Sequence, residues 1–211
     1  HERGLFVAGP VDGDPNNGEV SVLVRDGRLL GRIVANGTLS TLRHDEATGA
    51  YVAQSLDQQA FPTELQPRVP FVNPDAGVVA ADRALSLAGD TNGIVDLLVV
   101  YTPAARSAIG GTAAMETEIA GAVSNANLAL ANAGAVHRFR LAHQAEVTYT
   151  EAGSSDLDRL TDPDDGYMDV VHRLRDDYDA DIVSMVGTSN ACGVGWVMTS
   201  VTTGFQSYGF N

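Results

Sequence analysis

The five histidines are the first side chains to consider as metal ligands, and their spacing does not suit a shared ion. A helical H-E-x-x-H motif binds zinc because its two imidazoles lie one turn apart, with the glutamate placed to act on a water molecule. His1-Glu2 begins that pattern, but Leu5 stands where the second histidine belongs. We also expect this terminus to be disordered. His137 and His143 would lie about 20 Å apart along a strand. We therefore expect structural or surface roles for the histidines.

Motifs for nucleophilic catalysis or phosphate binding give no stronger signal. No serine stands in a G-x-S-x-G pattern, so a serine hydrolase gets little support. Gly110-Gly111 precedes an expected helix, but it lacks the G-x-G-x-x-G spacing, and the chain contains no lysine to complete a P-loop. We interpret this pair as a loop with permissive glycines.

Acidic residues are concentrated between Glu151 and Asp181, which hold 11 of the 27 acids with only three arginines. Calcium takes clustered carboxylate oxygens, and Asp162, Asp164 and Asp165 are suitably close in sequence. However, Pro163 breaks the D-x-D-x-D-G register, and no glutamate follows at the required position. Two interpretations stay open here, a solvated loop with a helix face or a calcium site.

The charge balance excludes several classes of partner. The formal net charge of −14 comes from 27 acids against 13 basic residues, all of them arginine. Nucleic acid and anionic membranes both need clustered positive charge, so we expect neither as a partner. No stretch approaches the roughly 18 apolar residues of a membrane span. Because the chain begins at His1, a signal peptide, if encoded, is already gone, and the composition fits a secreted protein.

The first part of the chain is typical of β-hairpins. Asp26-Gly27 and Asn36-Gly37 separate β-branched runs and favour type I′ turns, and Thr48-Gly49 marks a further turn. A small antiparallel meander is predicted from strands at 20–24, 29–34, 39–42 and 51–56. Residues 61–77 contain four prolines, which disfavour hydrogen-bonded ladders and indicate an extended wrapping segment or linker.

The second part has the alternating pattern of an α/β sheet. Ile94 to Tyr101 is a continuous apolar run, as in a strand buried on both faces. A helix should follow, with Thr112 as N-cap and Gly134 as C-cap. The order of elements predicts a largely parallel sheet with flanking helices. The remaining elements expected are a strand at 136–149, a helix at 167–178, a strand at 182–186 and an edge strand at 194–201.

These patterns together predict an α+β or α/β chain in three parts. Residues 1–77 should form a small antiparallel β-rich domain, residues 78–93 a linker, and residues 94–211 a mostly parallel, helix-flanked mixed sheet. The chain is long enough to bury a core in each of the two folded parts.

Four collinear segments of the second part are unusual enough to identify a family. They are 96–105 (DLLVVYTPAA), 165–176 (DGYMDVVHRLRD), 180–184 (ADIVS) and 192–196 (CGVGW). Together they resemble the peptidyl-Asp metalloendopeptidases, reprolysin-like members of the metzincin group. Residues 19–62 resemble the pro-region of that family more loosely. The fold implied for residues 94–211 is the N-terminal subdomain of a metzincin catalytic domain.

The resemblance implies a secreted zinc endopeptidase that is made as a zymogen and hydrolyses peptide bonds next to Asp. In the family the zinc helix, H-E-x-x-H-x-x-G-x-x-H, lies downstream of the position of Asn211. No catalytic residue or zinc ligand is therefore transferred to this chain, which should be inactive by itself. We expect the polypeptide to continue past Asn211, and the expected partners are a peptide or protein substrate and that C-terminal remainder of the catalytic domain.

The resemblance also implies a substrate-binding edge strand and a disulfide role for the single cysteine, with its partner shortly before the zinc helix. An extended peptide on such an edge gains main-chain hydrogen bonds. Cys192 would form a disulfide with a residue outside this chain, the alternative being a buried small hydrophobe. Arg138 or Arg140 would supply a basic pocket for Asp. The edge strand falls on Gly193, Val194, Gly195, Trp196, Val197 and Met198, with Trp196 at its rim or in the core.

Inhibition of such a zymogen should be steric. Residues 1–90 contain no cysteine, so a thiolate cannot silence the zinc from this region. The hypothesis is that the segment around Phe61 to Asp75 lies across the cleft. A preference for Asp makes the bond between Gly89 and Asp90 a candidate self-processing site. The alternative to an enzyme is a truncated relative that acts as a non-catalytic binding or assembly module.

Overall fold

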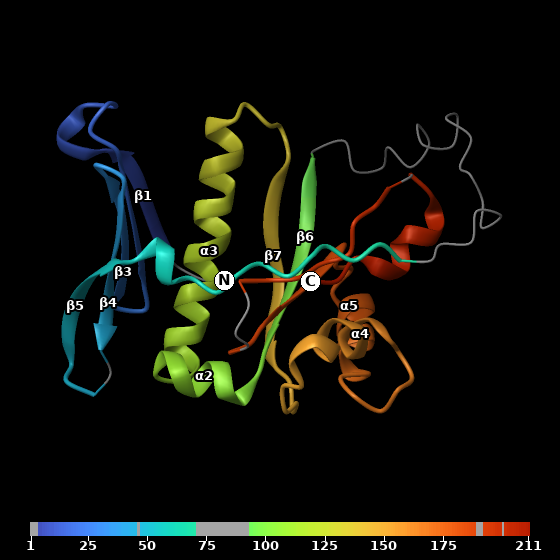
Figure 1. The fold of residues 1–211 in the computed structure, drawn as a ribbon. Coiled ribbons are helices and arrows are strands. Elements are labelled where there is room, and N and C mark those ends of the chain that lie inside the picture. Colours follow the sequence, from blue (N-terminus) through green and yellow to red (C-terminus); the bar gives the residue numbers. More distant parts are fainter. Residues whose placement is uncertain (1–3, 46, 71–92, 189–191, 200) are drawn as a thin grey trace. The chain divides into compact units, whose positions relative to one another are not determined.

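The computed structural model describes residues 4–45, 47–70, 93–188, 192–199 and 201–211 (Figure 1). The chain forms two compact units, each assembled from two stretches of sequence. The first unit comprises His1–Phe61 and Arg106–Ala135, and the second comprises Pro62–Ala105 and Val136–Asn211. The predicted linker at 78–93 lies almost wholly outside the described residues, so the three-part division stays a prediction.

The first unit contains a five-stranded antiparallel sheet. Its strands are β1 (Gly4–Pro10), β2 (Glu19–Arg25), β3 (Arg28–Ala35), β4 (Thr38–Asp45) and β5 (Ala50–Leu56), and they pair in sequence order. The predicted meander is confirmed. Asp26 and Gly27 have φ of 49° and 77°, and Asn36 and Gly37 have φ of 50° and 72°. Both central residues of each turn are thus left-handed, as type I′ turns require.

The expectation of a disordered N-terminus was wrong from residue 4 onward. Strand β1 pairs with β2 over its whole length, from Gly4 opposite Arg25 to Pro10 opposite Glu19. The reason is tertiary, because β2 offers a free edge whose backbone groups need partners. A short 3-10 turn (Val11–Gly13) follows β1, and another (Gln58–Ala60) follows β5.

Helix α3 (Thr112–Asn132) packs on this sheet and is preceded by helix α2 (Pro103–Ile109). The buried Arg25 donates from Nη1 to the carbonyl of Glu116 at 2.9 Å, and Ser21 Oγ donates to Asn125 Oδ1 at 2.7 Å. The predicted N-cap was wrong by one residue, since Gly111 occupies that position with φ of 117°. Gly134, with φ of 71°, terminates the helix as predicted.

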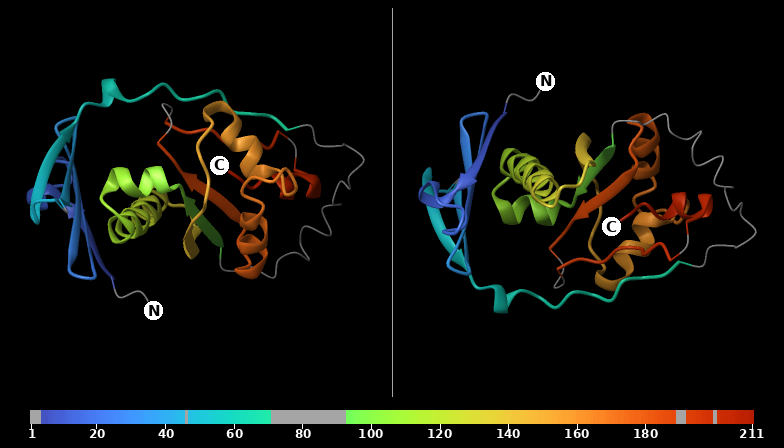
Figure 2. Two further views of the ribbon diagram at one scale, coloured as in Figure 1. Left: turned by 90° about the horizontal axis from the view of Figure 1, so that it is seen from below. Right: turned by 90° about the horizontal axis from the view of Figure 1, so that it is seen from above.

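The second unit contains three parallel strands in the order β7-β6-β8 (Figures 1 and 2). They are β6 (Ile94–Tyr101), β7 (Arg138–Glu146) and β8 (Ile182–Val186), and they confirm the predicted parallel sheet. Helices α4 (Asp156–Thr161) and α5 (Val170–Asp177) cover one face. Leu98 and Val100 of β6 meet Leu157, Leu160 and Val171 of the helices there, and all five are fully or almost fully buried.

The expected edge strand at 194–201 does not join this sheet. Instead, the last three residues extend it, because Val183 N donates to the carbonyl of Gly209 at 2.8 Å and Met185 N to that of Asn211 at 2.7 Å. Two further 3-10 segments, Gly153–Ser155 and Thr203–Tyr208, complete the unit. Arg175 fixes the approach to the added strand by donating to the carbonyls of Asp181 and Gln206.

None of the helices in the described ranges is long and apolar enough to cross a membrane.

Gly121 allows α3 to approach the five-stranded sheet closely. A Cβ atom at this position would lie 2.3 Å from Leu30 Cδ2. We expect Gly121→Val to lower the free energy of unfolding by about 2 kcal/mol, because the added atoms overpack this contact. The matched control is Ala122→Val, on the exposed face of the same helix. Chemical denaturation of both variants measures the difference, and equal losses would contradict the close approach at Gly121.

Candidate functional site

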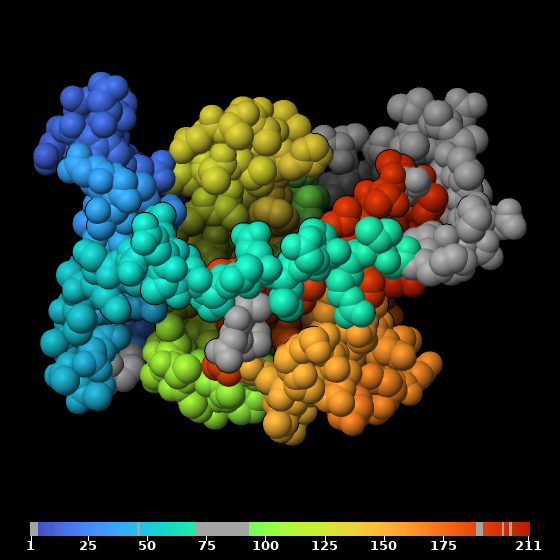
Figure 3. Space-filling model, in the orientation of Figure 1, coloured from blue at the N-terminus to red at the C-terminus, as the bar shows by residue number. Residues whose placement is uncertain are grey.

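Residues 62–70 lie extended on the surface of the second unit, against the segment predicted to bind substrate (Figure 3). Arg68 N donates to the carbonyl of Gly195 at 3.0 Å, and Val197 N donates to the carbonyl of Arg68 at 2.8 Å. These two bonds form a parallel bridge centred on Trp196. The pair is the only regular backbone pairing of residues 193–199 in the described chain, so this edge carries one chain segment as its partner.

Prolines hold the overlying segment extended. Pro62, Pro67 and Pro70 fix φ near −65° and carry no N–H, which disfavours both a helix and a continuous ladder. Pro67 also restricts the residue before it to extended conformations. Three of the nine residues of the segment thus lack a backbone donor, and Arg68 is one of the residues that keep theirs.

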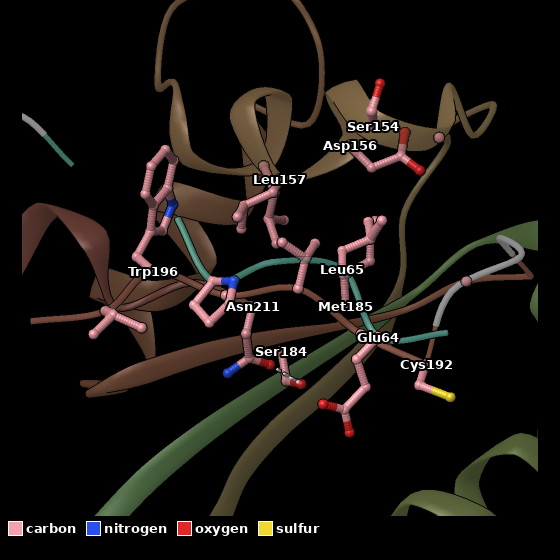
Figure 4. A pocket seen from close by; sticks show the side chains of 18 residues that line it. Glu64, Leu65, Ser154, Asp156, Leu157, Ser184, Met185, Cys192, Trp196 and Asn211 are labelled. Atoms are coloured by element: carbon pink, nitrogen blue, oxygen red, sulfur yellow. Dashed lines mark hydrogen bonds between the residues drawn. The ribbon is translucent and has the colours of Figure 1, made fainter. Parts of the chain in front are cut away.

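A cavity of about 720 Å³ lies beneath this segment (Figure 4). Leu65 of the segment lines it together with Leu157 of α4 and Met185 of β8. Ser184, Cys192 and Asn211 add polar groups, and Ser184 Oγ donates to Asn211 Oδ1 at 2.6 Å. A cavity with apolar and polar lining beside a backbone edge is the arrangement that accommodates alternate side chains of an extended peptide.

Asp156 is a buried acid on the wall of this cavity. Its Oδ1 accepts hydrogen bonds from the Tyr149 hydroxyl and from the Ala152 amide, both at 2.6 Å. Burial, together with the bond to Asp156, raises the pKa of Tyr149 above its ordinary value of 10.0. Tyr149 therefore stays protonated and donating, and the pair acts as a fixed support for α4 and the cavity wall.

Glu151 ties the end of β6 to the loop after β8. Its carboxylate accepts from the Thr102 hydroxyl at 2.5 Å and from both the amide and the hydroxyl of Thr188 at 2.8 Å. Burial acts to raise the pKa of Glu151, but these hydrogen bonds outweigh it and hold the pKa below its ordinary value of 4.5. The loop that leads to residues 193–198 is thus anchored by a charged group.

Cys192 is exposed, and its thiol donates to the carbonyl of Pro62 at 2.7 Å. The alternative of a buried small hydrophobe is therefore wrong. The predicted disulfide to a residue outside this chain stays a prediction. Pro62 is the first residue of the overlying segment. The hydrogen bond from the Cys192 thiol at Pro62 and the two backbone hydrogen bonds at Arg68 therefore both hold residues 62–70 on the second unit.

The other predicted site residues are not all brought together. Arg140 forms a bidentate ion pair with Asp96, and Arg138 donates to the carbonyl of His137; neither lines the cavity. Gly89 and Asp90 lie outside the described residues. Sequence reasoning missed Arg68 and Asp158, which face each other at the edge. The sequence signal that could have indicated this pair was a single arginine between Pro67 and Pro70, together with the acidic stretch at 151–181.

No three His, Cys, Asp or Glu side chains within the described ranges are placed to hold a metal ion. His143 instead stacks on Tyr178 with ring centroids 3.8 Å apart, and His172 Nε2 lies 3.2 Å from the carbonyl of Leu160. The described residues do not fit a zinc site. Calcium at the acidic stretch stays a prediction.

The chain is similar to curated proteins named peptidyl-Asp metalloendopeptidase. A relative from Xanthomonas campestris pv. campestris is 34% identical over 205 residues, covering 92% of this chain and 47% of the relative. One from Stenotrophomonas maltophilia is 30% identical over 200 residues, with 90% and 46% covered. One from Pseudomonas aeruginosa is 34% identical over 111 residues, with 51% and 17% covered. The first two alignments each cover about nine tenths of this chain.

The chain belongs to the peptidyl-Asp metalloendopeptidase family, as its sequence motifs indicated. It spans about half the length of the first two relatives. No protein-family model matches the chain. A chain in a solved structure described as a chaperone-substrate complex has a TM-score of 0.45 and 16% identity, with 86% of this chain and 24% of that chain covered. That likeness is too distant to define the fold.

The Glu151 network predicts a specific loss of stability in acid. Because the folded-state pKa is lowered, its stabilisation is complete above the ordinary value of 4.5 and disappears as the pH falls through the folded-state pKa. We expect Glu151→Gln to cost about 1 kcal/mol at neutral pH, with the gap to the native chain closing in acid. Asp177→Asn, at an exposed position of α5, is the control. Denaturation from pH 7 to pH 3 tests this, and a gap that does not depend on pH would contradict it.

Proposed function

We propose that this chain is the pro-region and the substrate-binding portion of a secreted zinc metalloendopeptidase zymogen that hydrolyses peptide bonds next to Asp. Residues 193–198 bind the substrate main chain, and residues 62–70 occupy the same edge before activation. The zinc ligands come from polypeptide outside these 211 residues, in a metzincin-like arrangement. Secretion is favoured by the acidic composition, with a formal net charge of −14.

The observation that carries the proposal is the main-chain pairing of Arg68 with Gly195 and Val197. A substrate that adds to this edge needs the same donor and the same acceptor, so the segment and the substrate exclude each other. This agrees with the hypothesis of steric inhibition, for the residues of Phe61 to Asp75 that the structure describes. The similarity to proteins named peptidyl-Asp metalloendopeptidase supports the reaction and the residue at the cleaved bond.

The edge is tested in the full-length polypeptide, after removal of its pro-region, with a peptide that contains one Asp. Val197→Pro removes the N–H that pairs with the carbonyl of Arg68, and we expect kcat/KM to fall about tenfold. Val197→Ala is the matched control, because it shortens the same side chain and keeps the N–H. Equal kcat/KM for the two variants would show that substrate does not use the Val197 N–H, and would contradict substrate binding at this edge. A polypeptide without bound zinc or peptidase activity would favour the non-catalytic binding module.

Processing gives an independent prediction. If the enzyme cuts before Asp in its own linker, Asp90→Asn should prevent maturation of the full-length protein at that bond. The control is Asp82→Asn, a neighbouring acid in the same predicted linker. N-terminal sequencing of the mature product decides the matter, since a native product that begins well away from Asp90 would reject self-processing there.

A further inference from the structure

The side chain of Arg68 occupies a site that has the features of guanidinium recognition. Its Nη1 lies 2.8 Å from Asp158 Oδ2, and its Cζ lies 5.0 Å from the centroid of the Trp196 ring. A carboxylate binds the donors at the edge of a guanidinium, while an indole face attracts its positive charge. The two contacts use different features of one side chain, and this combination suits arginine better than lysine.

The groups that receive Arg68 are held by contacts of their own. Trp196 Nε1 donates to Thr161 Oγ1 at 2.8 Å, and the ring meets that of Tyr208 edge to face at 5.2 Å. Asp158 and Thr161 stand three residues apart on α4 and therefore lie on the same side of the helix. Buried Leu157 anchors that helix in the core. The site is thus preorganised and does not depend on Arg68 for its shape.

The backbone pairing determines which residue of a bound peptide reaches this site. The two bonds to Gly195 and Val197 flank Trp196 and belong to a single peptide residue, here Arg68. Any extended peptide that makes the same two bonds brings one side chain to the same place. Asp158 and Trp196 therefore contact the side chain at one position of the bound peptide and can discriminate between residues at that position.

We propose that Asp158 and Trp196 form a specificity subsite for an arginine side chain of an extended peptide bound at residues 195–197. The inference rests on the proposed function, because it takes this edge as the place where substrate binds. It names the substrate class more closely, as peptides that carry arginine at the position paired with Trp196. Before activation Arg68 fills the subsite, so the inhibitory segment and the preferred substrate share one recognition element.

The expected discrimination is moderate. The side chains of Arg68 and Asp158 remain 38% and 51% exposed, so solvent screens the ion pair. The contact with the indole adds to it at a partly exposed site. We expect arginine to be preferred over an uncharged side chain of similar length by roughly tenfold.

Fluorescence tests the subsite in the 211-residue chain, because Trp196 is its only tryptophan. Arg68→Pro removes both the guanidinium and the N–H that pairs with the carbonyl of Gly195, which frees the edge. This variant is titrated with a peptide matching residues 65–70 and with the same peptide carrying glutamine for arginine. We expect the arginine peptide to change the emission of Trp196 and to bind roughly tenfold tighter. Adding Asp158→Asn should abolish the preference. Adding Asp162→Asn, an equal charge change just beyond α4, should retain it.

Hydrogen exchange of the Val197 amide gives a second measurement within the chain. Arg68→Gln and Asp158→Asn should each accelerate exchange several-fold, and the double variant should exchange no faster than the faster single variant. Arg68→Lys should show an intermediate rate, because it keeps the charge and loses the planar fork.

Additive effects on exchange, equal affinities of the two peptides, or no arginine-dependent change in emission would each overturn the subsite. Equal affinities would leave binding at the edge intact and reject only the arginine preference. A separate result would reject the proposed function, namely a full-length polypeptide that binds no zinc or has no peptidase activity.

Discussion

The backbone edge at residues 195–197, which the parallel sheet leaves without a partner strand, is the constraint on which the arrangement of the second unit depends. Residues 195–197 do not pair with β8, because the last residues of the chain already occupy that side. Backbone N–H and C=O groups that no strand of the sheet pairs need other partners, and Arg68 supplies both a donor and an acceptor. The proline-rich segment is suited to this role, since it is extended before it binds and so loses less conformational freedom on docking.

Hydrogen bonds from neighbouring side chains make the surroundings of residues 195–197 rigid. Glu151 anchors the preceding loop through Thr102 and Thr188, and Asp156 supports the start of α4 through Tyr149. Helix α4 in turn positions both the acid opposite Arg68 and the hydroxyl that fixes the indole of Trp196. A peptide-binding edge gains from such rigidity because less freedom is lost when the ligand binds.

Each of the two compact units combines two separate stretches of the sequence. Helix α3, expected as part of the parallel α/β portion, belongs to the same unit as the five-stranded sheet, where Gly121 and Leu30 meet closely. Its amphipathic pattern predicts a buried face but does not specify the surface that covers it. The proposed pro-region thus contributes to the packing of a helix that lies downstream of it in sequence, a relation that only long-range contacts define.

The sequence by itself determined the elements whose signals are local. The turns at Asp26-Gly27 and Asn36-Gly37, the apolar strands at 94–101 and 182–186, and the family motifs were all recognised from it, because backbone preference and continuous hydrophobicity act over a few residues. Tertiary structure alone decided that residues 209–211 and not 194–201 extend the sheet, and that Arg68 meets Asp158 and Trp196. Those contacts join residues far apart in the chain, and no local pattern encodes which distant edge or charge completes them.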